Sequence, residues 1–245
     1  MEGTMKYAQH LVAAMGVIFL AGALNTVSAN LILIAPENFA GTGLGAVNTI
    51  LTMTSPGATT AEQGCVGRST IGCPGGTANA ALDVIGGTLG GNELTGASQT
   101  LTRTIAALGL TTAANLRVVF NPQEPGNAAD NGITLNTLVL GIYDGTSNAL
   151  LFSASLAAPV VFPNTQTGVG NSGFVFGLTA AEAATAQGFF ATTNRIGLSA
   201  RATDATGGPE TFFVANTAIP EPASLLLLGS GLAGWGAWRW KKSQS

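Results

Sequence analysis

The sequence predicts a mainly β protein with a single β-sandwich-like domain and one short helix at about residues 179–190. This domain is expected to lie between an N-terminal signal peptide and a C-terminal transmembrane helix. Three observations support the prediction. Apolar and β-branched runs alternate with turn residues after Leu116, an Ala-rich segment follows Thr179, and each end of the chain carries a long apolar run.

The N-terminal segment, residues 1–29, has the three parts of an export signal. A short basic region precedes an apolar run over residues 11–24, and small residues follow it. Signal peptidase requires small side chains one and three residues before the cut, and Ala29 and Val27 meet this requirement. We therefore expect export by the Sec machinery and cleavage by signal peptidase, which would leave Asn30 as the first mature residue.

The middle of the chain, residues 30–219, is expected to form one β-rich extracellular domain. Its first part, residues 30–96, is rich in Gly, Thr and Pro and is predicted to be loop-rich, whereas residues 97–216 are better defined. Cys65 and Cys73 are the two cysteines of the chain. In an exported chain they most simply form a disulfide, because two thiols without a nearby histidine do not make a metal site.

Short strands separated by turn signals are predicted in the second part of this domain. Asp144-Gly145 is a strong turn signal between two such runs, so these two runs are expected to pair as a β-hairpin. Thr179 stands three residues before Glu182, which is the spacing of a capping box, and predicts a helix over 180–190. The predicted strands are 116–120, 133–143, 149–156, 160–162, 174–178, 195–200 and 211–215.

The C-terminal segment, residues 220–245, has three parts in a fixed order. A Pro-Glu-Pro sequence is followed by an uncharged stretch and then by a basic cluster. The uncharged stretch predicts a transmembrane helix over 223–240, and the basic cluster places the C-terminus in the cytoplasm by the positive-inside rule. The residues concerned are Pro220, Glu221 and Pro222 in the sorting sequence, and Arg239, Lys241 and Lys242 in the basic cluster.

This three-part tail, together with the N-terminal signal, resembles the PEP-CTERM sorting domain, which is also labelled an ice-binding protein C-terminal domain. The resemblance implies that an exosortase, a membrane peptidase, processes the tail near the Pro-Glu-Pro sequence. It also implies a Gram-negative host that makes exopolysaccharide or biofilm matrix. We therefore expect the chain to be held briefly in the inner membrane and then to reach the cell surface or the extracellular space.

Composition excludes several classes of function. Residues 30–219 contain five arginines, ten acidic residues, no lysine and no histidine, which gives a net charge of −5. Because this charge repels phosphate backbones, nucleic-acid binding is not expected. The missing histidines and lysines exclude Ser-His-Asp and Cys-His catalysis and Schiff-base chemistry in the mature domain. We expect no catalytic residue, no cofactor and no metal.

The sequence therefore predicts a non-enzymatic surface or matrix protein that is associated with exopolysaccharide or biofilm. A carbohydrate-binding module is one alternative, although Tyr143 is the only tyrosine outside the signal. A polysaccharide-acting enzyme that uses two carboxylates is a weaker alternative. A calcium loop also stays open, because one stretch is dense in oxygen ligands, namely Asn121, Glu124, Asn127, Asp130 and Asn131.

Overall fold

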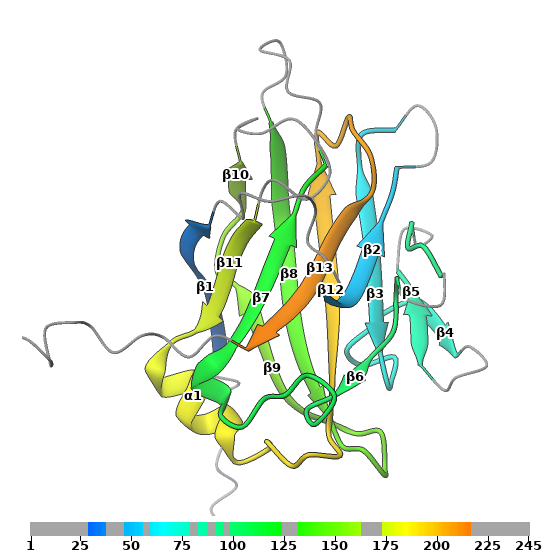
Figure 1. Cartoon of the computed structure of the whole chain (residues 1–245). Coiled ribbons are helices and arrows are strands. Elements are labelled where there is room, and N and C mark those ends of the chain that lie inside the picture. The colour runs from blue at the N-terminus through cyan, green and yellow to red at the C-terminus, as the bar shows by residue number, and fades with distance from the viewer. Residues whose placement is uncertain are drawn as a thin grey trace, which may run out of the picture.

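The computed structural model describes residues 29–37, 47–55, 59–78, 83–87, 92–95, 99–123, 132–162 and 173–216 (Figure 1). These residues form strands, one 3-10 helix and one α-helix. In chain order the elements are β1 (Ala29–Glu37), β2 (Asn48–Met53), β3 (Glu62–Gly67), β4 (Gly76–Ala78), β5 (Val84–Gly86), β6 (Arg103–Thr104), η1 (Ala113–Asn115), β7 (Leu116–Asn121), β8 (Ile133–Tyr143), β9 (Leu150–Leu156), β10 (Val160–Phe162), β11 (Gly173–Leu178), α1 (Ala180–Gln187), β12 (Arg195–Thr203) and β13 (Glu210–Asn216).

The described strands form one continuous curled sheet. Its order is β2-β13-β7-β11-β1-β9-β8-β12-β3-β5-β4, while β10 and β6 pair beside β8 and β12. The pairs are antiparallel except that β1 and β9 are parallel. In Figure 1 the strands β11, β7, β13 and β2 face β8, β12 and β3 across the core, so the curled sheet makes two layers. The mainly β, sandwich-like prediction is confirmed, with the difference that one sheet supplies both layers.

The two layers enclose a core that is rich in phenylalanine. Phe120 of β7 stacks on Phe212 of β13 with ring centroids 4.7 Å apart, and Phe162 lies 4.1 Å from Phe174. Leucine and isoleucine side chains of β8 and β12 belong to the same buried cluster. Every position of β7 and of β11 is buried, and each large apolar side chain removed from water contributes about 1.5 to 3 kcal/mol.

The short segment over residues 92–94 forms hydrogen bonds with both β2 and β3. The Asn92 backbone N–H donates to the Gln63 carbonyl oxygen at 2.8 Å, and the Asn92 side-chain oxygen accepts from the Gln63 N–H at 3.2 Å. On the other side, the Thr54 N–H donates to the Asn92 carbonyl and the Leu94 N–H donates to the Thr52 carbonyl. The segment therefore satisfies backbone groups at both edges, which would otherwise be open to pairing with other chains.

The helix α1 begins and packs as its sequence predicts. The Thr179 hydroxyl oxygen accepts from the Glu182 backbone N–H at 3.4 Å, which caps the first turn. Ala183 and Ala186 are buried against the core, and the Gln187 side-chain oxygen accepts from the Ala113 N–H of η1 at 2.8 Å. The described helix ends at Gln187, three residues before the predicted end, because Gly188 follows it.

The first part of the domain contains strands that its sequence does not predict. Residues 30–96 are predicted to be loop-rich, and their described part holds the strands β1 to β5 together with turns and irregular segments. β1 even lies inside the sheet, between β11 and β9. β3 (EQGCVG) and β4 (GTA) have few apolar side chains and several glycines, so their sequences carry no period-two pattern. Their strand conformation comes from their pairing partners and not from local propensity.

Candidate functional site

The sorting sequence lies in a part of the chain that the structure does not describe. This holds for Pro220, Glu221 and Pro222, for the basic cluster Arg239, Lys241 and Lys242, for the predicted transmembrane helix, and for Val27. Among the described residues, no helix has both the length and the apolar character that crossing a membrane requires. The described part instead shows where the strands next to the two terminal segments, β1 and β13, lie in the fold.

The first described strand, β1, begins at the same end of the sheet at which the last strand, β13, ends. Asn216, the last residue of β13, pairs with Leu116 at the start of β7. Along the neighbouring ladders, Arg117 of β7 pairs with Gly177, and Leu178 at the end of β11 pairs with Leu31 near the start of β1. These pairs form one row across the sheet, next to α1, and Figure 1 shows this end at the lower part of the molecule.

We call this end the α1 pole and define it by α1, η1 and the turn over residues 105–112. The turn is attached to the last strand, because the Asn216 side-chain N–H donates to the Gly109 carbonyl at 2.5 Å. It is also attached to the segment after α1, through the Ala106 N–H and the Thr192 carbonyl. Glu182 is the only charged residue in α1, η1 and this turn. The α1 pole therefore carries almost no charge, and most of its side chains are small.

The predicted signal cleavage point coincides with the start of a paired strand. Ala29 pairs with Ala154 and Asn30 pairs with Ser155 in the parallel ladder between β1 and β9. The next residue, Leu31, is 1% exposed and belongs to the core. In the folded domain, the bond between residues 29 and 30 is thus part of the sheet.

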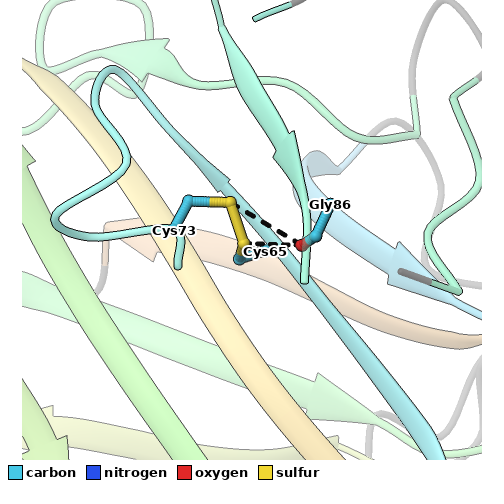
Figure 2. Close-up of a disulfide and its surroundings, with 3 residues drawn as sticks. All are labelled: Cys65, Cys73 and Gly86. Carbon is cyan, nitrogen blue, oxygen red and sulfur yellow. Dashed lines mark hydrogen bonds between the residues drawn. A yellow bond between two sulfur atoms is a disulfide. The ribbon is translucent and has the colours of Figure 1, made fainter. Parts of the chain in front are cut away.

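The disulfide predicted from the sequence is present. Cys65 of β3 is bonded to Cys73, with Cα atoms 5.3 Å apart, and both side chains are buried (Figure 2). The Gly86 carbonyl oxygen of β5 lies 2.6 Å from Cys65 Sγ and 3.7 Å from Cys73 Sγ. Because a disulfide sulfur carries no hydrogen, these are packing contacts. The bridge fixes the loop over residues 65–73 against β5.

The loop closed by the disulfide rests on Tyr143. A Cβ atom added at Gly67 would lie 2.5 Å from the Tyr143 hydroxyl oxygen, and one added at Gly197 would lie 2.9 Å from its ring. Gly72 leaves even less room beside the same hydroxyl group. Tyr143 is 1% exposed, and this burial raises the pKa of its phenol to about 12. The tyrosine therefore acts as a packing residue, and its ring is not available to stack on a sugar.

A buried polar network connects this region to β12. Asp83 is 3% exposed and accepts from the Thr102 hydroxyl at 2.6 Å and from the Thr102 N–H at 3.0 Å. The Arg195 Nε donates to the Thr102 hydroxyl at 2.6 Å, and Arg68 lies 3.4 Å from Asp83. Desolvation lowers the pKa of Arg195, an effect that Asp83 opposes and Arg68 strengthens. The network is a hydrogen-bonded support and presents no free nucleophile.

No local sequence pattern predicts this network. Thr102 is 19 residues from Asp83 and 93 residues from Arg195, so only the fold brings them together. Each residue alone resembles a solvated polar side chain.

The other acidic residues in the described part of the chain form no metal-binding group. Among the described residues, no group of three or more His, Cys, Asp or Glu side chains is placed to hold a metal ion. Asp144 accepts from the Ser147 N–H, the Ser147 hydroxyl and the Thr146 N–H, and these hydrogen bonds lower its pKa. Of the candidate calcium loop, Asn121 is buried at the end of β7, and the four remaining residues lie outside the described ranges.

Comparison with known protein families identifies one segment. Residues 218–242 carry a PEP-CTERM protein-sorting motif. The motif contains the Pro-Glu-Pro sequence and starts two residues after the end of β13. It marks an exported protein that an exosortase sorts at the membrane. No curated protein and no solved structure matches the chain.

Proposed function

We propose that this chain is a non-enzymatic protein of the cell surface or extracellular matrix, made with a cleaved signal peptide, held briefly in the inner membrane by the PEP-CTERM tail, and released into exopolysaccharide or biofilm. The observation that carries the proposal is the sorting motif at residues 218–242, which follows directly on a folded β domain. The order of signal, domain, motif and basic end gives a chain whose middle is exported while its C-terminus stays in the cytoplasm.

The chemistry of the domain supports a matrix role over catalysis. The Asp83 carboxylate accepts hydrogen bonds from Thr102 inside the domain. The Asp144 carboxylate accepts one from Ser147 within its own turn. Residues 30–219 are rich in Thr, Ser and Asn and have few charges, a composition that suits contact with hydrated neutral polymers by hydrogen bonds. The burial of Tyr143 counts against a binding module that stacks sugars on that ring.

Cell fractionation of two matched variants tests the sorting step. Glu221→Gln alters the sorting motif. Asp204→Asn removes an exposed carboxylate directly after β12 and leaves the motif unchanged. We expect the first variant to accumulate unprocessed in the membrane and the second to be processed and released like the natural chain. Equal processing of both variants, or of a chain that lacks residues 220–245, would refute sorting through the motif.

Enzymatic removal of the matrix polysaccharide tests the destination. The processed protein is expected to sediment with intact matrix and to become soluble when the polysaccharide is degraded. Recovery of the processed protein in the medium, whether or not polysaccharide is present, would refute the association.

A further inference from the structure

We propose that the α1 pole faces the bilayer while the chain is membrane-bound, and that the opposite end of the sheet points away from it. The inference rests on the proposed function, because it needs the tail to lie in the membrane. Its partner is the lipid surface itself. The argument uses the positions at which the two ends of the chain leave the sheet.

The exits are close together. From the start of β1 to the end of β13 the row crosses β11 and β7, which makes three strand spacings. At about 4.8 Å per spacing, the two exits are about 14 Å apart along the sheet. Both exits are at the α1 pole, since Leu31 pairs with Leu178 and Asn216 pairs with Leu116.

The connections to the membrane are short. Six residues, 217–222, separate β13 from the start of the uncharged stretch. Four residues, 25–28, separate the apolar run of the signal from β1. At no more than about 3.5 Å per residue, these connections reach about 21 Å and about 14 Å.

Two short connections that leave from one pole fix an orientation as well as a distance. A domain held by one long linker can turn freely, whereas this domain cannot turn its far end to the bilayer without detaching strand ends. β8 alone has 11 residues, so the sheet is about 35 Å long and the far end lies that much farther out. After the signal is removed, the six-residue connection still holds the pole near the membrane.

The chemistry of the pole agrees with this placement. Its exposed residues include Ala181, Ala184 and Thr185 on α1, and Thr111 and Thr112 before η1. With Glu182 as its one charged residue, the pole neither binds anionic headgroups strongly nor is strongly repelled by them. The short connections, and not adhesion to lipid, therefore hold the pole in place.

Energy transfer from the domain to the bilayer tests the orientation. Ala184→Cys on α1 and Val161→Cys on β10 each add one accessible thiol, since the native cysteines are paired and Val161 is 61% exposed at the far end. The full chain, with its tail intact, is reconstituted in phosphatidylcholine vesicles that contain an acceptor dye at the headgroups. We expect clearly higher transfer from position 184 than from position 161.

Each outcome has a separate meaning. Equal transfer from both positions, or higher transfer from 161, in a chain that floats with the vesicles overturns the orientation. Absence of the chain from the vesicle fraction overturns the proposed membrane step and the orientation with it. In a chain without residues 1–29, a 20-residue Gly-Ser insert after Asn216 is expected to abolish the difference, because the six-residue connection is then the one short tether and a flexible linker of 20 residues averages about 25 Å. A difference that survives this insert would overturn the short-connection argument.

Discussion

Tyr143 is the residue whose environment makes the sharpest single-site prediction. Burial raises the pKa of its phenol to about 12, against an ordinary value of about 10. The other tyrosine is Tyr7, within the predicted signal, so the mature chain has one phenol to titrate. We expect tyrosinate absorbance of the folded mature protein to rise with a midpoint near 12, whereas the urea-unfolded protein should titrate near 10.

The same shift affects stability at high pH. Since the folded-state pKa is the higher one, the stabilisation is complete below pH 10 and is lost as the pH rises towards 12. The loss should be about 2 to 3 kcal/mol, and Tyr143→Phe should not show it. A folded-state midpoint near 10 would contradict the burial of this phenol.

Glu93 is a partly buried acid that opposes folding when it is charged. One carboxylate oxygen is buried without a hydrogen-bond partner among the described residues, and desolvation raises the pKa of the side chain. Because this pKa is raised, stability is lost as the pH rises through it. We expect Glu93→Gln to increase the free energy of unfolding at pH 7 by less than about 1 kcal/mol, given solvent screening, and to have no effect near pH 4.

Asp144 provides a control for Glu93, because its pKa is shifted in the opposite direction. Hydrogen bonds from Ser147 and Thr146 lower its pKa, so its stabilisation is present at neutral pH and is lost as the pH falls through the folded-state value. Asp144→Asn should therefore destabilise the protein at pH 7. If both substitutions change stability in the same direction at pH 7, the electrostatic assignment is wrong.

Among the strands and the helix, the sequence predicts those whose formation depends on local patterns and turn residues. β7 to β13 carry apolar alternation bounded by turn residues, and their predicted positions agree closely with the described bounds. The turn at Asp144 and the helix cap at Thr179 were also predicted, because both depend on hydrogen bonds within four residues. These features are local, so a single sequence is enough to find them.

The features that the sequence could not reveal are long-range. β1 lies between β11 and β9 because Leu31 pairs with Leu178 and Asn30 pairs with Ser155, more than 120 residues away along the chain. No local pattern specifies such a partner. The support formed by Asp83, Thr102 and Arg195 was missed for the same reason.

The disulfide loop is an element whose contribution to stability can be isolated. Cys65 and Cys73 form a small buried cluster with Val84, separate from the main core. Replacing both cysteines by serine should lower the free energy of unfolding by about 2 to 3 kcal/mol, while the β signal in far-ultraviolet circular dichroism is kept. Urea unfolding measures the change.

Reduction of the natural chain is the matched control for this prediction. The reduced protein and the Cys65→Ser/Cys73→Ser variant should have similar unfolding midpoints in the same buffer. Free thiols in the exported protein under non-reducing conditions would show that the bridge is not formed in the cell.

For the whole molecule, the most general consequence comes from the groups that the mature domain lacks. Residues 30–219 have no histidine and no lysine, and their cations are five arginines, which stay charged. Between the acids and Tyr143, only the α-amino group that cleavage at the predicted signal site would create at Asn30 should titrate. Its pKa is ordinarily about 8, and the start of β1 is at the surface pole where that charge can stay hydrated.

The unfolding free energy of the processed domain should therefore be nearly constant from pH 6 to pH 9. Stability can depend on pH only where the folded and unfolded states bind different numbers of protons, and almost no group does so in this interval. Urea unfolding at one-unit steps of pH measures it. A change of more than about 1 kcal/mol in the natural domain over this range would mean that a group with an ordinary pKa outside it has been shifted into it, and a buried carboxylate would be the first to examine.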